Sequence, residues 1–402
     1  MTGMKVDRST SETTGIVLSE GGTTISVKNR FDYSYDIIYA GEALLSAGNS
    51  LLHDMIAGRR CLVVTSETVN ALYGRQIEDY FRLWFEDDQF RILALPVNAN
   101  KKNIEAVVNV CREANRFCLG RRSLFVAVGG GVLMDIVGMA SSIYMRKLDY
   151  VRIPTTLVGQ VDAGVGLKTG VDFEGSKNFI GTFHPPAAVL NDFRFLRTLD
   201  AEEIRNGLAE ITKMAIVADA ELFSLLENVS KNIVNYYITG TNVELTQKIN
   251  IISVMRMLEQ LQSDPYEKNL ARMVDFGHTF GPFLEMYTGH RIKHGRAVAL
   301  DMAISAEISY LLGRASAELH DRILKLLVDF GYHLYDNEAF DTERMWQSLD
   351  SIVLRRGGKL NLVIPTDIGR AEFLRDKGDL QKEVLNEAIT NLRDFNEGGC
   401  LK

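Results

Sequence analysis

The stretch that decides the fold is Leu124-Phe125-Val126-Ala127-Val128-Gly129-Gly130-Gly131. Its first five residues form a short apolar run, which predicts a buried strand. The three glycines then lead into a helix-like segment at residues 134–145. Glycines at such a junction let the backbone turn sharply and let a phosphate approach the amides at the helix N-terminus. The stretch therefore predicts a phosphate or dinucleotide cradle, although the spacing is not GxGxxG, and a plain tight turn is the alternative.

Short β-branched runs alternate with helical stretches around this turn. Further strands are predicted at residues 60–65, 90–96 and 150–154, with helices at 71–85 and 104–118. Strands and helices alternating at this length are typical of βαβ units and a parallel sheet.

After residue 195 the pattern changes, and long amphipathic segments dominate: 201–230, 243–261, 297–312 and 317–331. The sequence thus predicts a flexible arm at 1–30, an α/β domain with a Rossmann-like parallel sheet at 31–195, and a mostly α-helical domain at 196–402.

The composition is that of a globular protein with a full core. Of 402 residues, 46% are hydrophobic and 24% charged, and the formal charge is 45 − 52 = −7. An acidic balance without a basic patch argues against nucleic-acid or membrane-surface partners. No apolar run reaches the roughly 18 residues that span a bilayer. Four cysteines without paired spacing indicate a reducing compartment, so we expect a cytoplasmic protein.

Polar residues follow the predicted strand that ends at Pro154. They are Thr155, Thr156, Asp162, Lys168, Thr169, Lys177 and Asn178. Such residues at the carboxyl ends of parallel strands normally line a ligand crevice. Together with Arg146, the two lysines would supply positive charge for phosphate, although any one of these cations alone could be a solvated surface residue. The pattern predicts a nucleotide and an anionic substrate in one crevice.

A second group of residues suggests a metal site in the helical half. Glu210 lies among apolar residues of a predicted helix, one turn before Lys213, and a buried carboxylate needs a cation or a metal. His278 and His294 each adjoin a glycine near a predicted helix start. One Glu and two His form a three-ligand zinc set with an open position, as in catalytic sites. No short spacing ties the three together, and satisfied polar histidines are the alternative.

Several motifs occur together in a fixed order. They are Gly129-Gly130-Gly131-x-x-x-Asp135, Pro154-Thr155-Thr156, residues 161–170 (VDAGVGLKTG), Lys177-Asn178-x-x-Gly181, Leu208-Ala209-Glu210-Ile211-x-Lys213, residues 276–281 (FGHTFG) and His294-Gly295-x-Ala297-Val298. This series resembles the dehydroquinate synthase-like sugar phosphate cyclases over roughly residues 60–370.

The resemblance implies a set of site residues. It implies NAD bound by Gly129, Gly130, Gly131, Asp135, Thr155, Thr156, Lys101, Glu67, Lys177 and Thr198. It implies zinc, with cobalt as an alternative, held by Glu210, His278 and His294. Substrate and phosphate contacts are implied for Arg146, Lys168, Asn178, Lys213, Asp275 and, from the C-terminal segment, Arg355, Arg356 or Lys359. Catalytic roles are implied for Lys213, Lys168, Asp162 and Asp275, and the family implies a homodimer.

Departures from dehydroquinate synthase itself concern the substrate. Met257 and Ala271 align with the two basic residues that hold a substrate carboxylate there, although Arg272 would take one place if the register moved by one. Asp275 and Pro282 replace an Asn and a second His around the His278 motif, and an acid there favours contact with hydroxyls over phosphate. We therefore expect a substrate without a carboxylate, since charge-assisted bonds to one would be lost.

These departures, with Phe183-His184-Pro185-Pro186, resemble the branch that cyclises sedoheptulose 7-phosphate. The expected reaction forms 2-epi-5-epi-valiolone through transient oxidation by NAD, β-elimination of phosphate, reduction and an intramolecular aldol addition. The alternatives, in order, are 2-epi-valiolone synthase, desmethyl-4-deoxygadusol synthase and 3-dehydroquinate synthase. A metal-dependent alcohol dehydrogenase or a non-catalytic NAD-binding protein represents other classes of function.

Overall fold

The computed structural model describes residues 15–18, 25–29 and 32–398. The chain divides between Tyr35 and Asp36 into an N-terminal unit and one large compact unit. In the N-terminal unit, β1 (Gly15–Leu18) and β2 (Ile25–Lys28) pair antiparallel. Most of the arm predicted for residues 1–30 lies outside the described residues.

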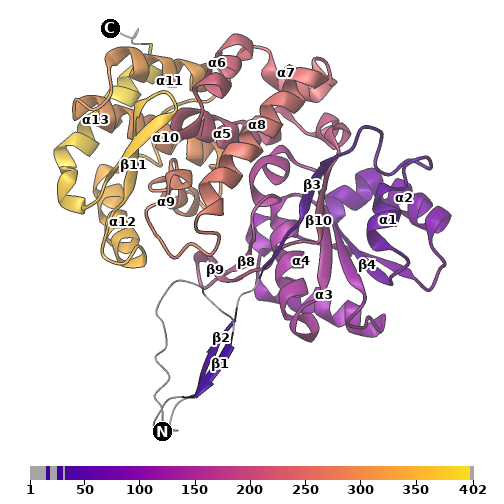
Figure 1. Cartoon of the computed structure of the whole chain (residues 1–402). Coiled ribbons are helices and arrows are strands. Elements are labelled where there is room, and N and C mark those ends of the chain that lie inside the picture. Colours follow the sequence, from indigo (N-terminus) through magenta and orange to yellow (C-terminus); the bar gives the residue numbers. More distant parts are fainter. Residues whose placement is uncertain (1–14, 19–24, 30–31, 399–402) are drawn as a thin grey trace, which may run out of the picture. The chain divides into compact units, whose positions relative to one another are not determined.

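A six-stranded parallel sheet forms the first part of the large unit (Figure 1), which confirms the predicted Rossmann-like fold. Its order is β3 (Asp36–Tyr39), β10 (Ala188–Asn191), β7 (Asp149–Pro154), β6 (Leu124–Gly129), β4 (Cys61–Ser66) and β5 (Phe90–Leu95). The four strands predicted from the sequence correspond to β4, β5, β6 and β7. The two that were not predicted, β3 and β10, have only four residues each and give a weak pattern.

Helices cover both faces of the sheet because its central strands alternate buried side chains between them. Cys61 and Val63 pack with α1 (Leu51–Ile56) and α2 (Glu67–Trp84). Leu62 and Val64 pack on the other face with α3 (Ile104–Arg116) and α4 (Gly131–Ile143). Strands buried on both faces are continuous apolar runs, which is the pattern that predicted them.

An antiparallel hairpin, β8 (Lys168–Phe173) and β9 (Ser176–Phe183), follows the sheet strand β7. A single π-helical turn, η3 (Gly159–Ala163), separates β7 from this hairpin. Two 3₁₀ turns lie at the ends of neighbouring elements: η2 (Tyr144–Arg146) and η4 (Phe193–Thr198).

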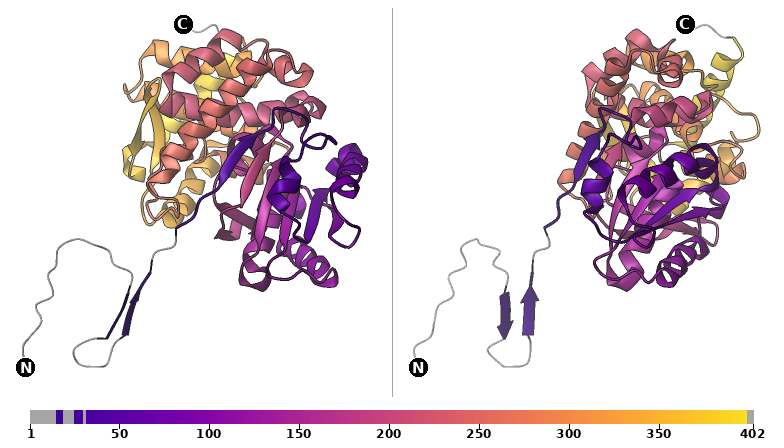
Figure 2. Two further views of the ribbon diagram at one scale, coloured as in Figure 1. Left: turned by 45° about the vertical axis from the view of Figure 1, so that its right-hand side comes forward. Right: turned by 90° about the vertical axis from the view of Figure 1, so that its right-hand side faces the viewer.

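The remainder is mostly helical, as predicted, and Figure 2 shows it beside the sheet in two views. Its helices are α5 (Ala201–Ala218), α6 (Ala220–Val229), α7 (Ile233–Thr239), α8 (Val243–Gln262), α9 (Gly281–Tyr287), α10 (His294–Leu311), α11 (Ala317–Asp329), α12 (Thr342–Arg355) and α13 (Lys382–Asn396). A hairpin of β11 (Leu362–Asp367) and β12 (Arg370–Leu374) was not predicted. The domain boundary predicted at residue 195 stays a prediction.

One predicted helix is in fact two. The segment 201–230 breaks at Asp219, whose extended backbone ends α5 and whose side chain accepts the Leu222 N–H to cap α6. An aspartate in this position competes with the helix for backbone donors, so the break follows from its capping preference.

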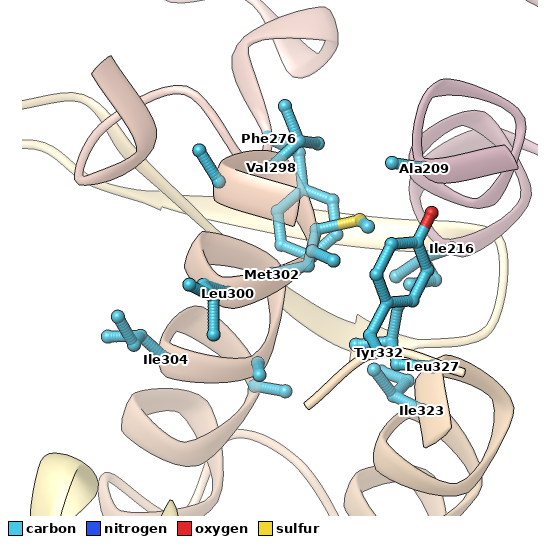
Figure 3. Packing of buried hydrophobic residues seen from close by; sticks show 14 of the residues in the cluster. Ala209, Ile216, Phe276, Val298, Leu300, Met302, Ile304, Ile323, Leu327 and Tyr332 are labelled. Carbon is cyan, nitrogen blue, oxygen red and sulfur yellow. The ribbon is translucent and has the colours of Figure 1, made fainter. Parts of the chain in front are cut away.

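Helix α10 is the centre of the helical part. It is buried along nearly its whole length, and it packs against α5, α9, α11, α13 and β11. Figure 3 shows Val298 and Met302 of α10 beside Phe276, with Ala209 and Ile216 of α5 nearby. Because α10 begins at His294, this core fixes one of the predicted metal ligands. No helix among the described residues is both long and apolar enough to cross a membrane.

Candidate active site

The three predicted metal ligands converge. Glu210 projects from α5, His278 from the turn before α9, and His294 from the first position of α10. The Nε2 atoms of His294 and His278 lie 2.9 and 3.7 Å from Glu210 Oε1. All three residues have a potential ligand atom within 4.8 Å of the others. Among the described residues, this is the group of His, Cys, Asp and Glu side chains that could hold a metal ion.

The other ring nitrogens show that this group fits a metal. His278 Nδ1 lies 3.1 Å from the Phe276 carbonyl, which can only accept, so Nδ1 carries the proton. His294 Nδ1 lies 3.0 Å from Glu285 Oε1 and is fixed in the same way. Both Nε2 atoms are therefore unprotonated in the neutral rings, and both face Glu210. Such outer partners normally orient metal-binding histidines.

Two close backbone contacts hold the ligands in place. Gly277 has φ +75°, and a Cβ there would lie 2.9 Å from Val298 Cγ1. Gly295 packs so closely on α5 that a Cβ would lie 2.2 Å from Asn206 Cα. Asn206 is one turn from Glu210, so this contact brings His294 to the carboxylate. The glycines beside both histidines therefore serve the placement of the ligands.

The turn after His278 is fixed by a buried acid that the sequence reasoning missed. Asp301 Oδ2 accepts the N–H groups of Thr279, Phe280 and Gly281 at 2.6, 2.6 and 2.8 Å. Asp301 is fully buried in α10, seven residues after His294 and so on a similar helix face. This single carboxylate connects the His278 turn to the helix that carries His294.

Glu285 is the second missed residue. It accepts the His294 Nδ1 proton with Oε1, and its Oε2 forms an ion pair with Lys177 of β9. Burial would raise the pKa of Glu285, but His294 and Lys177 hold it at about 2. Lys177, which was predicted to bind the cofactor, therefore contacts the metal cluster indirectly in this structure. An isolated acid within the apolar run Phe283-Leu284-Glu285-Met286 was the available signal.

Lys213 and Asp162 adjoin the cluster, as predicted for catalytic residues. Lys213 Nζ lies 2.6 Å from Glu210 Oε2, and both side chains are almost completely buried. Burial would lower the pKa of Lys213, but Glu210 and Asp162 raise it, so the ammonium is retained. Burial and the charge of Glu210 raise the pKa of Asp162. Lys213 thus presents a proton donor beside the three ligands.

A charged group lies next to this cluster. Lys168 Nζ lies 2.5 Å from Glu267, which also pairs with Arg272. Arg272 lies 2.6 Å from Asp275, and Arg356 lies 3.8 Å from the same carboxylate. Asp275 is therefore compensated by two arginines, and its pKa is lowered by them although burial would raise it. This pairing weakens the repulsion of phosphate expected from Asp275, and the contact of Asp275 with substrate hydroxyls stays a prediction.

The C-terminal candidates separate clearly. Arg356 reaches Thr279 Oγ1 at 3.3 Å and lies in the site. Arg355 instead contacts Ser176 Oγ at 3.3 Å, and Lys359 pairs with Asp376 at the surface.

Met257 is buried in a small cluster with Met214 and Val274.

The glycine turn starts α4, as predicted. Gly130 caps α4 without a side-chain bond, so the first N–H groups of the helix can bind an anion. Nearby, Lys102 Nζ lies 2.5 Å from both Asp135 Oδ2 and Asn178 Oδ1. The preceding Lys101, which was predicted to contact the nucleotide, is exposed in η1 (Ala99–Lys101). The structure therefore places Lys102, rather than Lys101, against the predicted cofactor and substrate residues.

Three predicted residues lie elsewhere or at the margin. Arg146 is exposed with φ +75° after the C-terminus of α4, about 20 Å along the helix from the glycine turn. This chain does not bring it to the cluster. Glu67 begins α2 directly after β4, and Thr198 binds the Tyr73 hydroxyl at 2.7 Å. Their cofactor roles stay predictions.

Comparison with known proteins supports one family. Residues 92–206 match the family described as 3-dehydroquinate synthase N-terminal, and residues 207–351 match 3-dehydroquinate synthase C-terminal. A 2-epi-5-epi-valiolone synthase of Streptomyces glaucescens is 39% identical over 94% of this chain and 96% of that protein. A demethyl-4-deoxygadusol synthase of Trichormus variabilis is 33% identical over 93% and 91%.

A solved structure agrees with these relatives. It is ValA, a 2-epi-5-epi-valiolone synthase from Streptomyces hygroscopicus subsp. jinggangensis 5008, determined with NAD+ and Zn2+ bound. It superposes with a TM-score of 0.86 at 36% identity, covering 92% of this chain and 99% of that one. The motif order, the converging ligands and these matches agree, and the chain belongs to the dehydroquinate synthase-like sugar phosphate cyclases.

Proposed function

We propose that the protein converts sedoheptulose 7-phosphate to 2-epi-5-epi-valiolone and phosphate, acting as a carbon–oxygen lyase with NAD and zinc. The observation that carries the proposal is the convergence of Glu210, His278 and His294 beside the buried ammonium of Lys213. The relative from Streptomyces glaucescens, which is 39% identical and bears the name 2-epi-5-epi-valiolone synthase, supports the choice of reaction. The predicted cytoplasmic location and homodimeric state stay predictions.

The substrate is proposed to lack a carboxylate because, among the residues that the structure describes, no unpaired cation lies at the positions that would hold one. Position 257 is a methionine packed among apolar side chains. Arg272, the neighbour of Ala271, pairs with both Glu267 and Asp275. A substrate carboxylate would have to displace one of these acids, and leaving a buried charge unpaired is costly.

Zinc at the three ligands would polarise the substrate oxygens, while NAD would accept and later return a hydride, so that no net oxidation occurs. Lys213 would donate a hydrogen bond to the reacting hydroxyl, and the position of its ammonium beside Glu210 supports this role. Lys168 and Arg356 would hold the phosphate and stabilise its charge as it leaves, and their positions in the charged group beside the cluster support this role. Glu285 keeps His294 in the tautomer that binds metal.

Three measurements on one reaction test the proposal: phosphate release, NADH absorbance and NMR of the product. Sedoheptulose 7-phosphate should release phosphate without accumulation of NADH and give 2-epi-5-epi-valiolone. The carboxylate-bearing heptulosonate phosphate should not react. Accumulation of NADH would indicate a dehydrogenase, and another cyclitol would indicate a different branch of the family.

A variant of the metal cluster provides a second test. His278→Ala removes one of three ligands, so bound zinc and cyclisation should be lost together. Metal content by elemental analysis and phosphate release would be measured on the same preparation. Wild-type turnover in a zinc-free His278→Ala protein would refute the metal assignment.

A further inference from the structure

Arg152 is a buried cation that the proposed chemistry does not use. It lies in the middle of β7 and is completely inaccessible to solvent. The hydrogen bonds of its guanidinium go to main-chain carbonyls. Nη1 donates to Gly164 O at 3.1 Å and Gly166 O at 2.6 Å, and Nη2 donates to Lys168 O at 3.3 Å. Burying a guanidinium against carbonyls alone is expensive, so a specific geometric role is the explanation to test.

Two aromatic residues complete this arrangement. The guanidinium carbon of Arg152 lies 5.2 Å from the centre of the Tyr150 ring, and the His184 ring stacks on Tyr150 at 5.2 Å and 18°. The Tyr150 hydroxyl donates to His184 O at 3.0 Å. The His184 N–H donates to Leu167 O at 2.8 Å. The histidine of the Phe183-His184-Pro185-Pro186 motif therefore binds the same loop as Arg152.

The loop held in this way is residues 164–168. The carbonyls of Gly164, Gly166, Leu167 and Lys168 are all bound by Arg152 or His184. This loop joins η3, which contains Asp162, to β8, which begins at Lys168. Asp162 therefore lies just before this short segment and Lys168 at its end, and hydrogen bonds hold the carbonyls between them.

We propose that Arg152, supported by Tyr150 and His184, is a positioning residue that sets the location of Lys168 against the substrate phosphate. The guanidinium presents several donors in a rigid plane, and so it can bind three carbonyls at fixed angles. The Lys168 side chain is more than half exposed and long, so the position of its backbone decides where its ammonium can reach. The proposal rests on the proposed function because it assumes that Lys168 contacts the phosphate.

A double-mutant cycle tests this coupling. Arg152→Gln should lower kcat/KM for sedoheptulose 7-phosphate by about 100-fold, the loss expected when a binding group moves by about 1 Å. NAD affinity and zinc content should stay at wild-type values. In the Lys168→Met background the same change should have almost no further effect, because Arg152 acts through Lys168. Equal losses in both backgrounds would overturn the proposal, and so would wild-type kinetics of Arg152→Gln.

A matched control is Arg59→Gln. Arg59 also donates to two main-chain carbonyls, Ile56 O at 3.0 Å and Met55 O at 2.8 Å, but it precedes β4, and it contacts β7 through an ion pair with Asp149 at the start of that strand. The kcat/KM of Arg59→Gln should equal that of the wild type. If Arg152→Gln does not fold, Arg152→Lys replaces it, since a lysine keeps the charge but cannot reach all three carbonyls.

Hydrogen–deuterium exchange separates this proposal from the proposed function. The amides of residues 164–168 and of His184 should exchange faster in Arg152→Gln than in Arg59→Gln. If Lys168→Met alone leaves kcat/KM unchanged, the phosphate assignment in the proposed function fails. If the exchange of this loop is unchanged in Arg152→Gln, the positioning role fails whatever the kinetics of Lys168→Met.

Discussion

Glu285→Gln should weaken zinc binding although Glu285 is not itself placed as a ligand. Each oxygen of this carboxylate accepts from a different partner. Oε1 must accept the proton of His294 Nδ1, and Oε2 must accept from Lys177. A glutamine has one accepting oxygen and one donating nitrogen. It can therefore satisfy His294 only by turning its amide N–H groups toward the ammonium of Lys177.

The opposite amide orientation is equally costly. The N–H group would then face His294 Nδ1 and favour the tautomer whose proton lies on Nε2, the atom that points at Glu210. In either orientation zinc affinity should fall by about 10- to 100-fold, or about 1.4 to 3 kcal/mol, which is the usual effect of removing the partner of a metal-binding histidine. Competition with a chromophoric chelator measures this affinity at constant pH.

A second variant shows whether this reasoning is right. In Glu285→Gln with Lys177→Met, the amide nitrogen no longer faces a cation, so the oxygen can turn to His294. The double variant should therefore bind zinc more tightly than Glu285→Gln alone. Zinc affinity of Glu285→Gln equal to that of the wild type would refute the argument, as would a double variant weaker than either single one.

Two further predictions concern stability, measured by urea unfolding. Asp301→Ala leaves three buried N–H groups of residues 279–281 unpaired, so the free energy of unfolding should fall by on the order of 3–5 kcal/mol. Asp301→Asn keeps one accepting oxygen, so the fall should be about 1–2 kcal/mol. Equal losses of stability in the two variants would contradict the structure. His320 lies 2.9 Å from Glu307, and its pKa is raised by Glu307 and Asp321 although burial would lower it. The ion pairs of the charged imidazole stabilise the fold fully below the unfolded pKa of about 6.5, and this stabilisation is lost as pH rises through the higher folded pKa. His320→Gln should therefore destabilise the protein more at about pH 6 than at about pH 9. A difference in unfolding free energy between wild type and variant that does not change with pH would argue against this assignment.

The sequence predicts the sheet well because its strands are buried on both faces. Residues 61–66 and 124–129 are almost wholly apolar, and the glycine turn marks where β6 meets α4. The same apolar pattern could not predict β11, which packs against α10, or β12, which packs against α5. The break at Asp219 needed the capping preference of one residue within a long amphipathic run.

The metal ligands could be predicted because each belongs to a recognisable motif, but their partners could not. Both Glu285 and Asp301 are acids in apolar helices. Asp301 is seven residues after His294 in α10, a spacing that indicates a shared helix face only once the helix boundaries are known. Glu285 lies in α9 and contacts His294 of the next helix, so no spacing within one helix indicates that contact. Lys101 and Lys102 show a second limit. Lys101 is exposed, whereas Lys102 is partly buried and contacts Asp135 and Asn178, and a motif does not resolve a shift of one residue.

Charge pairing in the site explains how so many ionic groups can be buried together. Lys168 is held by Glu267, Arg272 by Glu267 and Asp275, and Lys177 by Glu285. These three cations therefore each have a carboxylate partner among the described residues, which restricts the positions of their side chains before a ligand arrives. A phosphate must then share these cations with the acids, so the gain in binding is smaller than the charges alone suggest. What the arrangement supplies is donors that need little reorganisation, and preorganised donors favour the transition state more than they favour tight substrate binding.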